Sequence, residues 1–177
     1  MVKKLSKFFA YTIFFVLALM IFSPKSSAYF FMEANLKKFD VVISNEILKE
    51  NTFSLDVRNL HISVKGIDSA TIKKVNFKFL ILFNSIKFQN IELSSLVTSF
   101  VPAKINEINI SYTLFNPLYL NAHGVGRFGD IKVKINLLKR ELRAVLKPSQ
   151  KMLRSYQNSL RNFKKDSKGE YVYVKTF

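Results

Sequence analysis

Apolar and polar residues alternate with a period of two in most of the chain that follows Asp40. This alternation is typical of half-buried β-strands, because successive side chains of a strand point to opposite faces of the sheet. The connections between the alternating segments are short, so the crossover helices that parallel strands require have no room. The pattern therefore predicts a mainly β protein with minor α structure, built as an antiparallel β-meander.

The segment from Val75 to Leu93 is richer in apolar residues than alternation requires. It predicts a strand over Thr71 to Phe83, a turn at Asn84 and Ser85, and then a bulged strand. Such a dense run either lies in a core that is covered on both sides or lines an apolar surface that holds acyl chains. The candidate lipid-facing residues are Val75, Phe77, Phe79, Ile81, Phe83, Ile86, Phe88 and Ile91.

The first 28 residues have the pattern of an export or anchor segment, with three lysines before an uncharged run from Phe8 to Phe22. By the positive-inside rule the N-terminus stays in the cytoplasm and the rest crosses the membrane. The run spans only about 22 Å as a helix, against ~30 Å for the hydrocarbon core. This short length and the small residue Ala28 favour a signal peptide that is cleaved after Ala28, whereas Lys25 and the aromatic residues that follow favour a retained anchor.

Two organisations of the chain therefore stay open. In the first, residues 1–28 are a membrane anchor and residues 29–177 form a β-rich domain on the far side of the membrane. In the second, cleavage releases the same domain as a soluble periplasmic protein.

Two segments beyond the anchor have helical spacing. Residues 29–39 carry a weak apolar stripe, which predicts a short helix. A stronger stripe predicts an amphipathic C-terminal helix over Pro148 to Phe163, followed by a closing strand over 171–177. Ten basic and two acidic residues lie between Lys139 and Lys168, so this helix has a basic face, which is either simply solvated or lies on an anionic surface. The candidate anionic-surface residues are Lys147, Lys151, Arg154, Arg161, Lys164 and Lys165.

The stretch HGVGRFGD, residues 123–130, has the glycine spacing of dinucleotide-binding sites. A helix must start at such a motif to bind the pyrophosphate, whereas Asp130 to Asn136 has strand alternation, and no carboxylate lies about twenty residues further on. The chain has no cysteine, and its two histidines, His61 and His123, stand alone in strand contexts. We therefore expect a non-enzymatic protein without catalytic residues, cofactor or metal.

The chain carries 28 lysines and arginines against 12 acidic residues, a formal charge of +16. Such a balance indicates binding to nucleic acid or to an anionic membrane surface, although a lysine-rich background composition explains it as well. Export separates the chain from nucleic acid, so we expect no nucleic-acid partner.

The C-terminal third reads NPLYLNAHGVGRFGDIKVKINLLKRELRAVLKPS, then an amphipathic helix, then GEYVYVKTF. It resembles the end of the type II secretion system protein N family, relatives of the AsmA-like lipid-transfer proteins of Gram-negative envelopes. The front of the chain is similar in its order of basic start, apolar anchor, short helix and strands. This chain is shorter than typical members of that family.

The resemblance implies a single-pass inner-membrane protein whose periplasmic sheet is curved into a trough, with a role in envelope lipid handling or type II secretion. The implied partners are membrane lipid or lipopolysaccharide, or secretion and envelope-assembly proteins on which a structural protein docks. It carries no catalytic residues to this chain.

Overall fold

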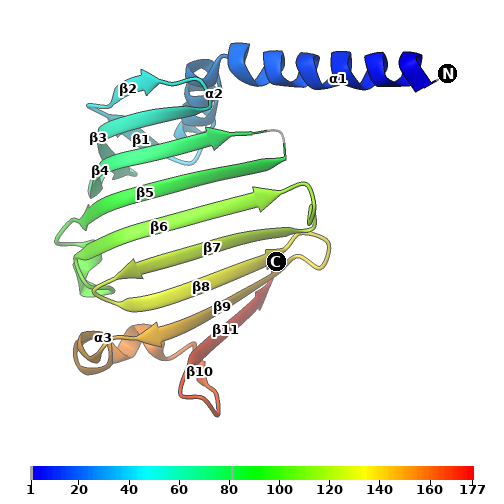
Figure 1. Cartoon of the computed structure of the whole chain (residues 1–177). Helices are drawn as coiled ribbons and strands as arrows, with labels where there is room; N and C mark the ends of the chain where they lie inside the picture. The colour runs from blue at the N-terminus through cyan, green and yellow to red at the C-terminus, as the bar shows by residue number, and fades with distance from the viewer. Residues whose placement is uncertain (1, 81) are drawn as a thin grey trace.

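The computed structural model describes residues 2–80 and 82–177, and in these residues the chain forms one large antiparallel sheet with three α-helices (Figure 1). Side chains are described from Lys4 onward, apart from residue 81. The helices are α1 (Val2–Phe22), α2 (Lys25–Lys37) and α3 (Gln150–Ser155), with 3-10 turns at Val97–Ser99 and Gln157–Leu160.

The sheet contains eleven strands in the described residues, and it follows the chain almost strand by strand. Its order is β1-β3-β4-β5-β6-β7-β8-β9-β11-β10, with β2 beside β1 on the outer edge of β3. Every pairing is antiparallel and the sheet does not close, which confirms the predicted meander. The strands are β1 (Val41–Ser44), β2 (Ile47–Glu50), β3 (Ser54–Val64), β4 (Ile67–Phe79), β5 (Phe83–Leu93), β6 (Lys104–Thr113), β7 (Tyr119–Gly126), β8 (Gly129–Asn136), β9 (Glu141–Pro148), β10 (Lys164–Lys165) and β11 (Tyr171–Thr176).

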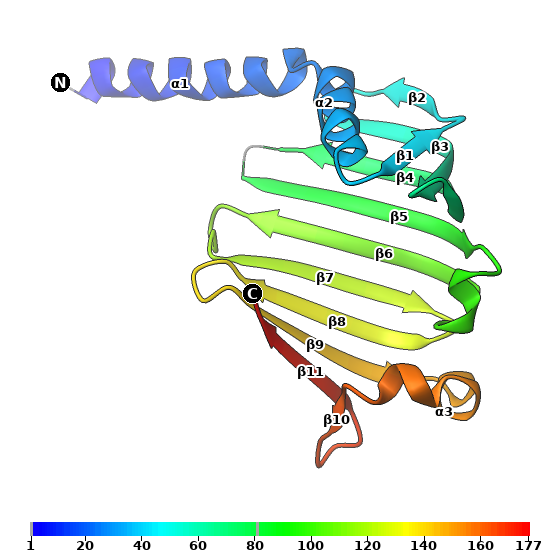
Figure 2. The ribbon, with the colours of Figure 1, turned by 180° about the vertical axis from the view of Figure 1, so that it is seen from behind.

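The sheet has one apolar face and one polar face, because the strand register aligns residues of the same kind. Phe77 lies between Leu55 and Ile86 in the register, whereas the neighbouring Asn76 lies between Asp56 and Lys87. Both α2 and α3 lie on the apolar face (Figure 2).

Each of these helices closes a separate hydrophobic core. Under α2, Leu55, Val57 and Val75 are fully buried, and the Tyr29 ring packs against Phe77 with 5.8 Å between ring centroids. The second core lies at α3 and the 3-10 turn after it, and it contains Phe128, Leu146, Met152 and Leu160.

The hairpin between β4 and β5 differs from the sequence expectation. Strand β4 ends at Phe79 and β5 begins at Phe83, so the chain turns before Asn84 and Ser85, and reciprocal backbone hydrogen bonds of 3.2 and 3.1 Å join Leu80 and Phe83. This position pairs Phe77 with Ile86 on the apolar face, so apolar register outweighs the turn preference of Asn-Ser.

The expected single helix over Pro148 to Phe163 is wrong in extent. The helix α3 begins after Ser149, whose hydroxyl caps its first turn, and it ends at Tyr156, which leaves helical geometry with φ −132° and ψ 33°. A 3-10 turn follows. The residues after Tyr156 are rich in Asn and Ser, which form helices poorly, and Leu160 has to reach the sheet to be buried there.

Candidate functional site: an open apolar strip

Part of the apolar face belongs to neither hydrophobic core. This part, which we call the open strip, consists of seven half-buried residues on β6, β7, β8 and β9. The strand register places all seven on the face that carries α2 and α3. The open strip is formed by Ile110, Tyr112, Leu120, Ala122, Val133, Ile135 and Leu142.

The dimensions of the elements explain why the strip stays open. A sheet ten strands wide measures about 43 Å across, whereas a 13-residue helix such as α2 is only about 20 Å long and ~10 Å thick. The helix α2 lies over the first strands, and the six-residue α3 lies at the far corner. Figure 2 shows the middle of the sheet between them without a covering helix.

A pocket of about 380 Å³ lies at one end of the open strip. Its apolar lining comes from the strip residues Ile110, Tyr112 and Leu120 and from Phe79 and Ile86 of the neighbouring strands. Among its polar lining residues, Asn84 lies on the apolar face beside Tyr112, whereas the register places the side chains of Lys78, Ser85 and Ser111 on the opposite, polar face. An open apolar pocket of this kind suits the acyl part of an amphiphile.

The predicted lipid-facing residues separate into three groups. Val75, Phe77 and Ile91 are buried in the core, where they contact no ligand from outside. Phe79, Ile86 and Phe88 are half-buried on the apolar face, and the first two line the pocket. Phe83 is an exposed residue whose register places it on the polar face, and Ile81 lies outside the described residues.

The open strip itself was missed in the sequence. The alternation of Ile108, Ile110 and Tyr112 is visible there, and so is that of Leu118, Leu120 and Ala122. That these runs remain uncovered depends on the reach of helices that lie elsewhere in the chain. Periodicity within one strand does not contain that information.

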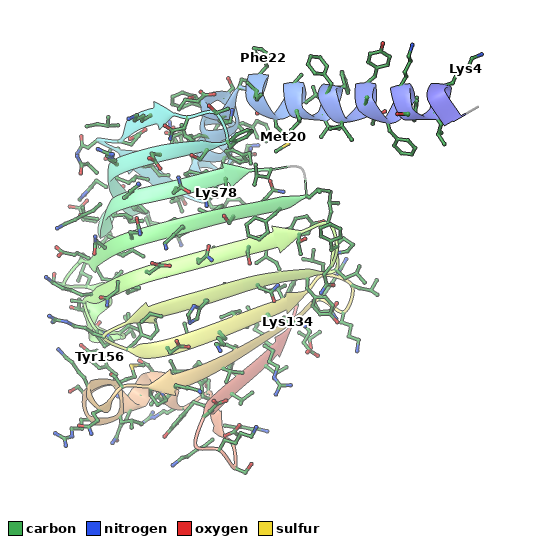
Figure 3. The ribbon with its side chains drawn as sticks, in the orientation of Figure 1. Lys4, Met20, Phe22, Lys78, Lys134 and Tyr156 are labelled. Carbon is green, nitrogen blue, oxygen red and sulfur yellow. The ribbon has the colours of Figure 1, made fainter. Side chains whose placement is uncertain are left out.

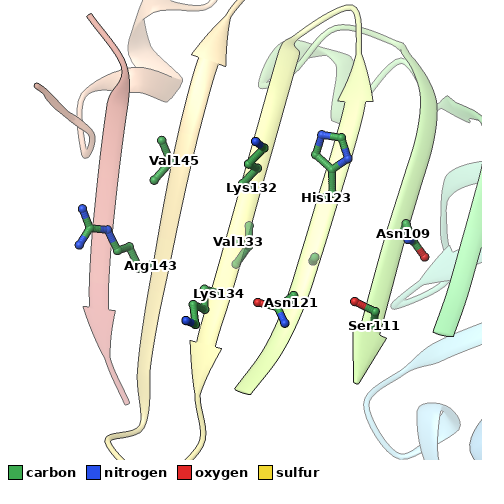
Figure 4. A pocket seen from close by; sticks show the side chains of 10 residues that line it. Asn109, Ser111, Asn121, His123, Lys132, Val133, Lys134, Arg143 and Val145 are labelled. Atoms are coloured by element: carbon green, nitrogen blue, oxygen red, sulfur yellow. The ribbon is translucent and has the colours of Figure 1, made fainter. Parts of the chain in front are cut away.

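The polar face carries a second pocket, of about 430 Å³, over β6 to β9 (Figure 4). Three cations project into it, and Lys134 lies over the ring of Tyr119 at 4.0 Å from the centroid. Figure 3 shows the side chain of Lys134 on this face together with that of Lys78. The polar side chains that line the pocket are Asn109, Ser111, Asn121, His123, Lys132, Lys134 and Arg143.

Both histidines are on the polar face, and each bonds an aspartate seven residues later across a hairpin. The Nε2 atom of His61 lies 2.9 Å from Asp68, and that of His123 lies 2.8 Å from Asp130. In the described residues no group of three or more His, Cys, Asp and Glu is placed to hold a metal ion.

The six anionic-surface candidates do not form one helical face, because the helix that would join them is broken. Lys151 and Arg154 lie on α3, Arg161 follows the 3-10 turn, and Lys164 and Lys165 form β10. Lys147 lies on β9 and donates to the carboxylate of Glu170 at 3.0 Å, which raises the pKa of this lysine.

The helix α1 is long and apolar enough to cross a membrane. Its segment Lys4–Phe22 has a mean hydropathy of 2.1 and is not buried against the rest of the chain. A membrane anchor and a signal sequence both fit this description.

No family model matches this chain, and comparisons with curated proteins and with solved structures find no match.

Proposed function

We propose that this chain is an envelope protein without enzymatic activity, anchored in the inner membrane by α1, which holds the apolar part of a lipid on its open strip. The observation that carries the proposal is the strip itself, an apolar surface that a folded chain leaves uncovered at the centre of its sheet. The resemblance to type II secretion protein N and to AsmA-like lipid-transfer proteins points in the same direction.

The contacts at the start of α2 support a retained anchor. Ala28, the residue after which a signal peptidase would cut, lies inside α2. Lys25 is only 2% exposed, and both Lys25 and Ser26 bond the carboxylate of Glu50. Cleavage after Ala28 would remove these contacts and would leave a charged amino group on Tyr29, which is 1% exposed. With the anchor retained, the β-rich domain lies in the periplasm.

The size and chemistry of the strip pocket support a lipid ligand. Each methylene group that enters an apolar site contributes about 0.8 kcal/mol, so several methylenes in the pocket suffice for binding. A phospholipid or the lipid part of lipopolysaccharide supplies such acyl chains.

A photoreactive phospholipid with a diazirine in its acyl chain tests the proposal. The full chain is reconstituted in vesicles that contain this lipid, irradiated, and digested for mass spectrometry. We expect adducts on residues 105–122, in β6 and β7, in addition to those on α1. Ile110→Asn and Leu120→Asn should lower the adducts on the sheet. Val64→Asn, at the end of β3 and away from the open strip, is the control and should leave them unchanged. Adducts confined to α1 would rule out the lipid site.

A second candidate function is docking on a secretion or surface machine, and the outer edge of β11 favours it. In the described residues β10 pairs only with Tyr171 and Val172, so the rest of that edge, from Tyr173 to Thr176, carries no strand. Such an edge accepts a strand from another protein. A photo-crosslinker at Val174 should then give one defined protein adduct in cells, whereas a diffuse pattern would speak against docking at this edge.

A further inference from the structure

One end of the sheet exposes a row of large apolar side chains. In a meander every second hairpin lies at the same end, so the loops β4–β5, β6–β7 and β8–β9 share an end with the last residues of β11 (Figure 1). The side chains in this row are between 43 and 83% exposed. We call the row the apolar rim, and it consists of Leu82, Phe83, Leu114, Phe115, Leu118, Leu137, Leu138 and Phe177.

Backbone hydrogen bonds join the loops of the apolar rim to one another. The amide of Leu114 donates to the carbonyl oxygen of Leu82 at 3.1 Å, and that of Leu137 donates to Leu118 at 2.8 Å. The amide of Phe177 donates to Arg140 at 2.9 Å. The rim is therefore one continuous structural edge, and its apolar side chains are not independent loop tips.

The opposite end of the sheet is different in the described residues. The β3–β4 connection is Lys65-Gly66, and the aromatic residue of the β7–β8 connection, Phe128, is buried. The exposed large apolar residues at this end lie on separate elements, and they include Phe39 before β1, Val64 and Ile67 beside the β3–β4 turn, Leu96 and Phe100 in the β5–β6 connection, and Leu153 on α3. The hairpin loops themselves therefore differ, because every loop at the rim end exposes a large apolar residue, whereas the β3–β4 and β7–β8 loops of the opposite end expose none.

The helix α1 projects away from the sheet on the side of the apolar rim (Figures 1 and 2). The rim loops 80–83, 114–118 and 137–140 contain no acidic residue, and the last of them contributes Lys139 and Arg140. Tyr119 follows directly after Leu118. Proteins that contact the interface of an anionic bilayer commonly expose Leu and Phe there, together with cationic residues and tyrosine.

We infer that the apolar rim lies in the surface of the bilayer that α1 enters, so that the sheet stands end-on against the membrane. The strip row closest to the rim, formed by Tyr112, Leu120, Ile135 and Leu142, then faces the lipid phase at its open end. This contact rests on the proposed function only in taking α1 to be a membrane anchor. It gives lipid a direct path between the bilayer and the open strip.

Measurements of the depth of single fluorophores in the bilayer test this inference. Because the sequence has no cysteine, one introduced cysteine gives a single labelling site. A fluorophore is placed at Phe115→Cys or Leu138→Cys in the rim, at Leu96→Cys as the matched exposed residue of the opposite end, and at Phe14→Cys in α1. The chain is reconstituted in vesicles of phosphatidylethanolamine and phosphatidylglycerol. Quenching is measured with nitroxides attached to lipid and with iodide in water.

We expect lipid nitroxide to quench the two rim labels roughly twofold or more above the Leu96 label, as for groups ~5–10 Å inside the headgroup boundary. Leu138→Asp should reduce the quenching of the Phe115 label, whereas Leu96→Asp should not.

The label on α1 distinguishes failure of the rim contact from failure of the membrane anchor. If the Phe14 label is quenched by lipid while the rim labels behave like the Leu96 label, the rim contact is wrong and the anchor stands. If no label is quenched by lipid, the anchor and the rim contact are both wrong. Rim labels that are shielded from iodide and from lipid alike would mean that a protein covers the rim, which also overturns the inference.

Discussion

Tyr29 is the residue of α2 that is most deeply buried in the core, and its ring and its hydroxyl have different surroundings. The ring is 1% exposed and packs edge-on against Phe77 in the core. The hydroxyl is buried without a hydrogen-bond partner, and burial, together with the charges of Glu46 and Glu33, raises the pKa of Tyr29 far above its usual range. The ring therefore contributes stability, whereas the hydroxyl costs desolvation without compensation.

Substitutions at this position should separate the two contributions. Tyr29→Phe should leave the free energy of unfolding unchanged or slightly higher, because an unpaired buried hydroxyl is removed. Tyr29→Ala should lower it by about 3–5 kcal/mol through loss of the ring. Chemical unfolding of the full chain in detergent, followed by circular dichroism, measures both. Phe31→Ala, at an exposed position of the same helix, is the control and should be nearly neutral. A clear loss of stability in Tyr29→Phe would mean that the hydroxyl has a partner.

At the scale of elements, the N-terminus of α2 is capped by a carboxylate that belongs to a strand. Pro24, which precedes the helix, offers no capping side chain. Instead Glu50, at the end of β2, accepts hydrogen bonds from the amides of Lys25 and Ser26, at 3.2 and 3.3 Å, and from the Ser26 hydroxyl at 2.6 Å. A negative group at a helix N-terminus is also favoured by the helix dipole. The start of α2, next to the apolar helix α1, is thus bonded to the edge of the sheet.

The titration of this carboxylate predicts a pH dependence. The hydrogen bond from the Ser26 hydroxyl lowers the pKa of Glu50, burial opposes this effect, and the bonds from the two amides and the charge of Lys25 lower the pKa further. A lowered pKa in the folded state means that the contact stabilises the fold at pH values above the ordinary value of 4.5 and is lost as the pH falls below it.

We therefore expect the thermal unfolding midpoint of the wild-type chain to fall more steeply with acidification than that of Glu50→Gln. Circular dichroism at several pH values from neutral to below 4 measures the difference. Glu141→Gln, at the far side of the sheet, should follow the wild-type curve. Parallel curves for wild type and Glu50→Gln would contradict this role of Glu50.

For the whole molecule, the position of α2 means that cleavage after residue 28 would also remove part of the folded domain. The expected boundary at residue 28 falls inside α2, whereas α1 ends at Phe22 and the chain turns at Ser23 and Pro24. Removal of residues 1–28 would therefore take away the first turn of a helix that covers the larger core. A chain that keeps α1 keeps this core intact.

We predict that the chain isolated from membranes retains residues 1–28. Intact mass spectrometry should give a mass near 20.5 kDa, and a reporter fused after Phe177 should lie across the membrane from the N-terminus. Ala28→Leu, which blocks signal cleavage, should leave the mass unchanged apart from the substitution itself. A mature chain that begins at Tyr29 would contradict the prediction.

Most of the fold could be predicted from local patterns, and the parts that could not share a cause. The period of two in runs such as Ile131 to Ile135 assigns strands, and short connections order them into a meander. The break of the C-terminal helix at Tyr156 and the position of the hairpin between β4 and β5 both depend on which apolar residues pack on the sheet or pair across it. The periodicity of a single strand does not predict these contacts, because they form between residues that are distant in sequence.

The sequence by itself determined the antiparallel sheet and the apolar helix at its start, because hydrophobic periodicity and a charge-free run act within one segment. Only the tertiary structure decided which apolar residues remain open. Ile91 and Ile110 are both apolar strand residues on the same face, yet α2 and its neighbours bury the first and no helix of the described chain reaches the second. Exposure depends on the reach of two short helices over a wide sheet, and the apolar rim depends on hairpins brought to one end by the register.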